Sequence, residues 1–197
     1  MKPELFYPAK PYIVTQPWGV YRPEIYSQFG FTMHNGVDIR IGSDNTLRAE
    51  FPCETINTGW QPSGAGLYMT VLSNDEYDFD DGVRCRVMVD YMHLKEIKKY
   101  PGRDYRSGVG DILAIPNNTG FSTGPHTHAQ YRRVHKTPQG IVNVDTNDAN
   151  NSFDPEPFRD GQYAVDYRNT QIANLQKSLE VARGILLGLL EKLKWHS

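Results

Sequence analysis

The amino-acid sequence predicts a mainly β domain followed by one C-terminal α-helix. Residues 67–72 and 84–92 alternate apolar side chains with others, which is typical of strands that bury one face. Glycines interrupt the chain repeatedly between residues 64 and 124, and no segment there has a helical period. Apolar residues near the C-terminus instead recur at spacings of three and four, which indicates a helix.

Residues 1–31 are rich in proline and aromatic residues. Their five prolines rule out a long helix, because proline removes a backbone donor and clashes with the preceding turn. We expect an extended, irregular segment that wraps the domain and walls a cleft.

Two polar regions predict loops. Acidic residues between positions 75 and 81 separate two predicted strands without the spaced ladder and closing Glu of an EF-hand, so we expect a solvated hairpin loop. Residues 141–170 contain many Asn and Asp side chains and are expected to be loop-like.

The C-terminal repeat has the spacing of a coiled-coil seam, on a helix of about 25 residues. Its members are Ile172, Leu175, Leu179, Ala182, Leu186, Leu189 and Leu193. Gly184 and Gly188 would each weaken an isolated helix by roughly 1 kcal/mol, so the helix needs packing. Three partners stay open: the chain's own domain, a second copy of the chain, or a membrane or other partner. We divide the chain into a domain over residues 1–160 and a linker with an amphipathic helix over residues 161–197.

Composition narrows the function classes. The chain has 197 residues and a formal charge of −2, which argues against a general basic surface for nucleic acid. It has no run of about 18 apolar residues, so no membrane span is expected. Cys53 and Cys85 lack a C-x-x-C spacing, and we expect buried free thiols, with one disulfide as the alternative.

Histidine and aspartate residues form three groups that can bind a metal or move protons. The segment His34–Asp38 contains an Asn-Gly turn signal, and a turn can bring an imidazole and a carboxylate to one point. His126 and His128 are two residues apart in a predicted strand, so both point to one side. His93 follows another apolar strand. Alone, the His34–Asp38 segment and His93 are more often structural, whereas the His126/His128 pair is as often a metal site as a surface pair with no role.

Together these groups match the needs of a catalytic zinc. Such a site takes three protein ligands and keeps one position open for water. His34, Asp38 and one of the His126/His128 pair supply the ligands, and two histidines remain for acid–base chemistry. The residues alone leave open which of His126 and His128 is the ligand.

Three motifs, in this order, resemble those of a known family. They are His34-Asn-Gly-Val-Asp38, Tyr91-Met-His-Leu94 and Asn118-Thr-Gly-Phe-Ser-Thr-Gly-Pro-His-Thr-His128, with Val109-Gly-Asp-Ile-Leu113 upstream of the third. They are similar to motifs of the lysostaphin-type (LytM-like) zinc metallopeptidases, which cut peptide crosslinks in bacterial peptidoglycan. The resemblance covers roughly residues 13–134.

The resemblance implies a mainly antiparallel β-sheet with a groove over Zn²⁺. It implies that His34, Asp38 and His128 bind the metal and that His93 and His126 act in catalysis. We expect five residues around this site to contact substrate: Asn35, Tyr91, Ser122, Thr123 and Tyr131. Asn117, Gln130 and a longer insertion around residues 74–84 depart from the family pattern, and these departures would alter the groove wall.

The expected function is zinc-dependent endopeptidase activity on peptidoglycan crosslinks. Two alternatives remain: a non-catalytic module of the same fold that binds peptidoglycan or activates a partner, and a zinc hydrolase acting on another peptide. The N-terminus shows no apolar stretch of signal-peptide length. Two explanations stay open for an enzyme that acts on the cell wall: a signal that has been removed, or a phage-encoded enzyme released at lysis. The sequence does not distinguish glycyl bridges from D-Ala–diaminopimelate bonds as the target.

Overall fold

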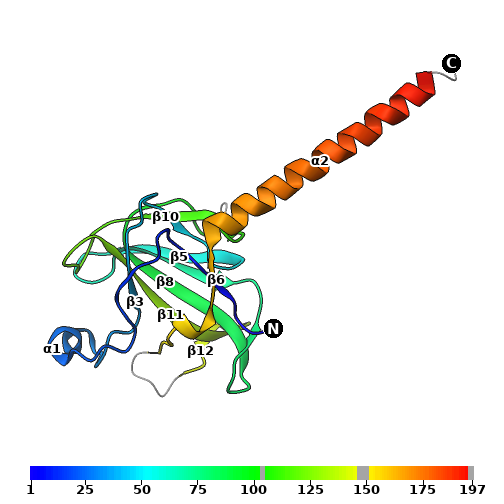
Figure 1. Cartoon of the computed structure of the whole chain (residues 1–197). Helices are drawn as coiled ribbons and strands as arrows, with labels where there is room; N and C mark the ends of the chain where they lie inside the picture. Colours follow the sequence, from blue (N-terminus) through cyan, green and yellow to red (C-terminus); the bar gives the residue numbers. More distant parts are fainter. Residues whose placement is uncertain (103–104, 146–150, 195–197) are drawn as a thin grey trace.

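The computed structural model describes residues 1–102, 105–145 and 151–194 (Figure 1). Its centre is strand β8 (Arg84–Ile97), which pairs with β11 (His126–Thr137) on one side and with β6 (Gly66–Ser73) on the other. The main sheet continues outward from these strands through β3 (Val37–Arg40) and β2 (Val14–Gln16) beyond β11, and β5 (Cys53–Gln61) and β9 (Arg106–Ser107) beyond β6. Shorter strands join it at the margins: β4 (Leu47–Arg48), β7 (Tyr77–Asp78), β10 (Ile112–Pro116) and β12 (Gly140–Asn143).

All strand pairs within this sheet are antiparallel, which confirms the predicted fold class of a mainly antiparallel β domain with a C-terminal helix. Val87, Val89 and Tyr91 of β8 are completely buried, and Met88 and Asp90 between them are only 5% and 7% exposed, so both faces of the central strand are covered there. The core lies between the sheet and the segments that wrap it, and it includes Leu5 from the N-terminus and Phe153 near the C-terminal end of the domain.

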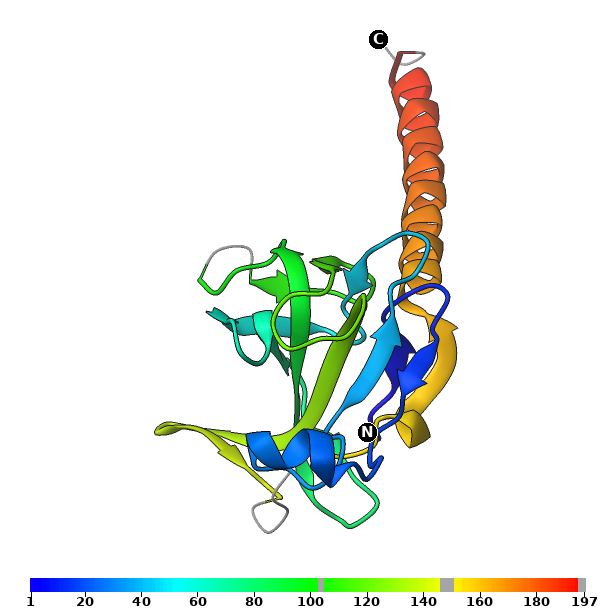
Figure 2. The ribbon, with the colours of Figure 1, turned by 90° about the vertical axis from the view of Figure 1, so that its left-hand side faces the viewer.

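The N-terminal segment contains no long helix among its described residues, in keeping with its prolines. It contains β1 (Leu5–Tyr7), β2, a four-residue helix α1 (Pro23–Tyr26) and a 3₁₀ turn η1 (Ser27–Phe29). Pro23 sits at the start of α1, where its missing N–H costs nothing. Figure 2 shows the blue N-terminal segment running beside the yellow-orange strand β13 (Arg159–Tyr163), and the two pair in parallel.

The acidic segment between residues 75 and 81 is a hairpin loop, as predicted. Strand β7 within it pairs with the start of β8. Its carboxylates are held in ion pairs: Asp81 with Arg133, and Asp80 with Lys2.

The two cysteines are free and buried, which confirms the expectation of free thiols over a disulfide. Burial is the largest cause that raises the pKa of the Cys53 thiol, to about 12, and of the Cys85 thiol, to about 11. Both are therefore protonated and unreactive at neutral pH.

The expectation of loop throughout residues 141–170 was wrong. This region contains β12, the 3₁₀ turn η2 (Glu156–Phe158), β13 and the first turns of helix α2 (Ala164–Lys194). The helix begins earlier than its apolar repeat, and its first turns contact the domain: Ala164 is completely buried and the Tyr167 ring lies 4.8 Å from that of Phe6. Lys10 Nζ lies 2.7 Å from the Asp166 carboxylate, and Arg168 forms an ion pair with Asp111.

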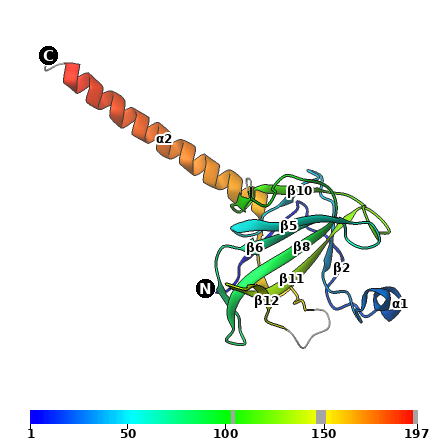
Figure 3. The same ribbon diagram turned by 180° about the vertical axis from the view of Figure 1, so that it is seen from behind.

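Beyond its first turns, α2 projects away from the domain (Figures 1 and 3). Ala164 is completely buried, whereas Leu175 and Leu179 are 70% and 71% exposed. The alternative in which the seam packs on the chain's own domain is therefore wrong for the described residues. No described helix has the length and apolar content needed to cross a membrane.

A buried ionic network connects β1 and β13 to the central strands β8 and β11. Glu50 accepts hydrogen bonds from the hydroxyls of Tyr91 on β8 and Tyr131 on β11, at 2.6 and 2.5 Å. The guanidinium of Arg159 on β13 pairs with the same carboxylate and donates to the Phe6 carbonyl at 2.9 Å. Glu50 and Arg159 side chains are almost completely buried, so each charge depends on the other for stabilisation.

Removing one partner of the Glu50–Arg159 pair tests how much the pair stabilises the fold. Glu50→Ala leaves a buried guanidinium and two buried hydroxyls without their acceptor, so the free energy of unfolding should fall by about 3–5 kcal/mol. Denaturant unfolding of the full chain measures this change.

Glu54→Ala is the matched control for Glu50→Ala. Glu54 forms a surface pair with Lys136 at 2.6 Å, and loss of a surface pair should cost about 0–1 kcal/mol. Equal small losses in both variants would show that the buried pair has no special role.

Candidate metal centre

Strand register brings the predicted ligands together. In the β11–β3 pair, His128 lies opposite Asp38, and in the β11–β8 pair it lies opposite Met92, just before His93. His34 reaches the same point from the turn that precedes β3. Three segments far apart in the sequence therefore deliver side chains to one end of the sheet.

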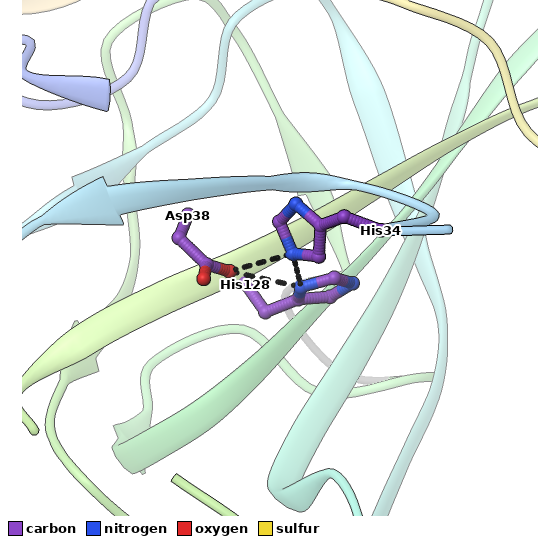
Figure 4. A group of neighbouring side chains, drawn as sticks. All are labelled: His34, Asp38 and His128. Carbon is purple, nitrogen blue, oxygen red and sulfur yellow. Dashed lines mark hydrogen bonds and ion pairs between the residues drawn. The ribbon is translucent and has the colours of Figure 1, made fainter. Parts of the chain in front are cut away.

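Three donor atoms form a small, nearly equilateral triangle (Figure 4). His34 Nε2 lies 3.1 Å from Asp38 Oδ1 and 3.0 Å from His128 Nδ1. The third side, from His128 Nδ1 to Asp38 Oδ1, is 3.0 Å. His34 and His128 are 2% and 8% exposed, so the triangle is shielded from bulk water.

Backbone hydrogen bonding fixes the tautomer of His34. Its Nδ1 lies 2.9 Å from the Pro17 carbonyl oxygen, which can only accept, so Nδ1 carries the proton. The Nε2 lone pair consequently points into the triangle. A ligand histidine whose other nitrogen donates to a backbone carbonyl is the usual arrangement at protein metal sites.

The carboxylate of Asp38 is ionised despite its burial. Burial raises the pKa of this group, but the imidazoles of His128 and His34 beside it outweigh burial and hold the pKa well below the ordinary value. Burial lowers the pKa of His128, which favours the neutral imidazole that a metal requires. The triangle thus offers one carboxylate oxygen and two imidazole nitrogens.

This donor set fits a divalent metal. Zinc binds imidazole nitrogen and carboxylate oxygen at about 2.0–2.2 Å in tetrahedral sites, which separates ligand atoms by about 3.3–3.5 Å. The observed sides of 3.0–3.1 Å need only a slight opening to reach that spacing.

Two more histidines lie beside the triangle without entering it. The rings of His93 and His126 have centroids 4.9 Å apart, and the His93 ring lies 6.3 Å from that of His128. His93 Nδ1 donates to the Thr119 carbonyl and His126 Nδ1 donates to the Gly124 carbonyl, each at 2.7 Å. In both residues Nε2 is therefore the nitrogen left for chemistry, and that of His126 lies 3.5 Å from Asp38 Oδ1.

The position of His93 imposes backbone strain. Its φ of 63° lies in the left-handed region, which non-glycine residues seldom adopt. The chain fixes it there with two hydrogen bonds, from His93 N–H to the Ala65 carbonyl and from Asn117 N–H to the His93 carbonyl. Strain of this kind is concentrated at functional sites. Burial is the main cause that lowers the pKa of His93 to about 4, so its imidazole is neutral at neutral pH.

The residues expected to contact substrate divide into two groups. Ser122 and Thr123 lie on the loop before His126, and Ser122 Oγ is 3.2 Å from His126 Nδ1. Tyr91 and Tyr131 are instead completely buried and donate to Glu50, which corrects their expected role: no surface of either ring is open to a substrate. Asn35 is 7% exposed.

Sequence reasoning missed Tyr26. Its ring stacks on that of His34 with centroids 5.6 Å apart, and burial together with the charge of Asp38 raises its pKa. Its hydroxyl accepts a hydrogen bond from Gln16 and keeps its own proton for donation. No spacing signal marked it, because α1 is too short to show a period.

Exposed aromatic rings meet near the site. Phe29 of η1 and Phe121 of the loop before His126 form an edge-on pair with centroids 5.2 Å apart. They are 37% and 47% exposed. The groove expected over the metal stays a prediction. A cavity of about 390 Å³ lies elsewhere, beside Arg133 further along β11.

Comparisons with known proteins find sequences related to lysostaphin and to a glycyl-glycine endopeptidase. No family model matches the chain. Lysostaphin of Staphylococcus simulans is 32% identical over 98 residues, which is 50% of this chain and 18% of the relative. Glycyl-glycine endopeptidase ALE-1 of Staphylococcus capitis is 30% identical over 125 residues, which is 64% of this chain and 28% of the relative. The chain thus spans less than a third of the length of these relatives.

Solved structures extend the likeness to the fold. The catalytic domain of the antimicrobial peptidase lysostaphin from Staphylococcus simulans superposes with a TM-score of 0.55 and 26% identity, over 76% of this chain and 92% of that domain. LytU superposes with a TM-score of 0.53 at 22% identity, over 74% of this chain and 82% of that one, and supports the fold alone. The likeness covers most of the β domain.

A methyl group at Gly36 tests whether close backbone approach shapes the triangle. A Cβ there would lie 2.5 Å from the Ala129 carbonyl oxygen and 2.7 Å from His128 Nε2. Gly36→Ala should displace His128 and weaken metal binding by about 10–100-fold, as measured by titration calorimetry with Zn²⁺.

Gly124→Ala controls for a methyl group on the other side of the site. A Cβ at Gly124 meets no atom within 4 Å, so metal affinity should stay at the wild-type value. Unchanged affinity in Gly36→Ala as well would show that His128 is not part of the metal centre.

Proposed function

We propose, from the premise that this chain is related in sequence and fold to the lysostaphin-type metallopeptidases, that it is a zinc-dependent endopeptidase. The observation that carries the proposal is the triangle of His34, Asp38 and His128 with two further histidines beside it. The proposed substrates are peptide crosslinks of bacterial peptidoglycan, and the proposed place of action is the bacterial cell wall.

The metal in this proposal is Zn²⁺. His34 Nε2, Asp38 Oδ1 and His128 Nδ1 would hold it, because these are the three atoms that converge. A bound zinc supplies Lewis acidity, which brings the pKa of water toward about 7 and polarises a carbonyl group. With one carboxylate among the ligands, the centre keeps a net positive charge, which favours negative charge on a substrate oxygen.

His93 and His126 would move the protons. Both hold their Nδ1 proton on a backbone carbonyl, so each Nε2 can accept a proton from an attacking water and return it to the leaving amine. Their fixed rings need no reorganisation during the reaction. Ser122 Oγ and the Gly124 carbonyl hold the His126 ring in place.

Tyr26 would donate a hydrogen bond to the substrate. Its hydroxyl proton is free because the oxygen accepts from Gln16, and its ring rests against His34. A donor at this position suits the carbonyl oxygen as it gains charge. The loop residues Ser122 and Thr123 are the proposed peptide contacts on the opposite side.

Single-histidine variants test these roles. His34→Ala should lose bound zinc and all activity, because it removes a ligand. His126→Ala should keep zinc yet hydrolyse about 10²–10⁴-fold more slowly, because it removes only a proton-transfer group. Zinc content by mass spectrometry and clearing of a purified peptidoglycan suspension measure the two properties.

His135→Ala is the control, since His135 is exposed on β11 and pairs with the distant strand β12. It should keep both zinc and activity. A metal-free His126→Ala protein would show that His126 rather than His128 is the ligand. Zinc binding without any clearing by the wild type would favour a binding module.

The bond that is cut separates the peptidoglycan proposal from another peptide substrate. One relative is named a glycyl-glycine endopeptidase, so glycyl-bridged peptidoglycan is the first substrate to test. We expect fragments with a new amine within the bridge, released from glycyl-bridged peptidoglycan and absent when a chelator is present. Mass spectrometry of fragments from this material and from directly crosslinked diaminopimelate peptidoglycan identifies the bond. Release from neither would contradict the assigned substrate class.

A further inference from the structure

Helix α2 carries an apolar seam that no other part of the described chain covers. The described side chains of this α2 seam are Ile172, Leu175, Leu179, Ala182, Leu186 and Leu189. The four leucines are between 53% and 71% exposed, and Ile172 is 43% exposed. A contiguous apolar stripe of this length is unusual on a monomeric soluble protein.

The helix also lacks the packing that its sequence requires. A helix of 31 residues in water is stabilised mainly by burial of an apolar face, and α2 makes its domain contacts only in its first turns. Gly184 and Gly188 lower its intrinsic stability further, and a Cβ added at either glycine would meet no atom within 4 Å. A partner along the seam would supply the missing burial.

We propose that the partner is a second copy of this chain, joined through the α2 seam as a parallel two-stranded coiled coil. The alternate spacing of three and four places Ile172, Leu179 and Leu186 at a positions, with Leu175, Ala182 and Leu189 at d positions. Such a seam is self-complementary, because in a parallel pair each layer is made by the same residue from both copies.

The residues that flank the seam are compatible with this pairing. In a parallel dimer the g position of one helix faces the following e position of the other. These pairs are Gln171 with Gln176 and Ser178 with Arg183, so no like charges face each other. In the first heptad, Ile172 at a with Leu175 at d also favours a two-stranded parallel assembly.

The charge pattern argues against a membrane surface as the partner. A helix that lies on a membrane combines its apolar face with a polar face rich in Lys and Arg. The polar positions of α2 instead mix Lys177 and Arg183 with Glu180. Binding of α2 to a membrane is therefore the alternative result that the experiment must be able to detect.

A parallel dimer has a consequence for catalysis. The β domain is joined to the N-terminal end of α2, so both metal centres lie at the same end of the coiled coil. Two sites on one assembly raise the local concentration of the second site once the first has bound a polymer. The pairing itself does not depend on the peptidase chemistry.

The mass of the full chain in solution tests the proposal. Light scattering across a range of concentrations should give a dimer for the wild type. Leu179→Lys combined with Leu186→Lys places charges in two a layers and should give a monomer. The β domain should unfold at the wild-type temperature in this variant, because neither side chain contacts the domain.

Val181→Lys combined with Leu187→Lys is the matched control. These side chains are 59% and 52% exposed on the same helix, but they lie at c and b positions outside the seam. The control should remain a dimer. A monomeric wild type, a dimeric seam variant, or equal dissociation of both variants would overturn the proposal, and so would a monomer that sediments with anionic phospholipid vesicles.

Crosslinking tests the parallel orientation. Ile172→Cys places a thiol in an a layer, where two copies meet in a parallel dimer, so mild oxidation should yield a covalent dimer. In an antiparallel pair the two thiols would lie about 30 Å apart, since the opposing position is near the C-terminal end of the seam. The native cysteines are buried and do not compete. A dimer that fails to crosslink would overturn the parallel arrangement.

Discussion

The antiparallel register of β3, β11 and β8 is the constraint on which the candidate metal centre depends. It places His128 opposite Asp38 on one side and opposite Met92 on the other. Because side chains alternate between faces, a slip of one residue would turn His128 and His126 to the other face of the sheet. The turn at Gly36 then adds His34, since only a residue without a side chain fits against the Ala129 carbonyl and the His128 ring.

Contacts beyond the donor triangle keep it ready for a metal. The Pro17, Thr119 and Gly124 carbonyls each orient a different histidine ring, so the tautomers are set by the backbone. Below the site, the Glu50 carboxylate links β8 and β11 through two tyrosine hydroxyls. Strands β1 and β13 contribute no donor atom to the triangle. Through Arg159 and Glu50 they support β8 and β11 beside the metal-ligating side chains.

Local patterns predicted the parts of the structure that are encoded locally. Alternation predicted β6 and β8, and the resemblance selected the three residues whose donor atoms converge. The patterns failed where long-range packing decides. Tyr91 and Tyr131 look like groove residues in sequence but are buried against Glu50, which is distant in the chain. The first turns of α2 contact the domain through ion pairs of Asp166 and Arg168 and through the Tyr167 ring, and these contacts leave no apolar period in the sequence.

X-ray absorption at the zinc edge of the purified full chain tests the central claim most directly. The account predicts a first shell of nitrogen and oxygen at about 2.0–2.2 Å with two imidazoles and no sulfur. The two buried thiols should contribute nothing to that shell, because both are protonated and Cys53 and Cys85 lie in the core. A sulfur shell near about 2.3 Å, or a protein that retains no zinc, would contradict the account.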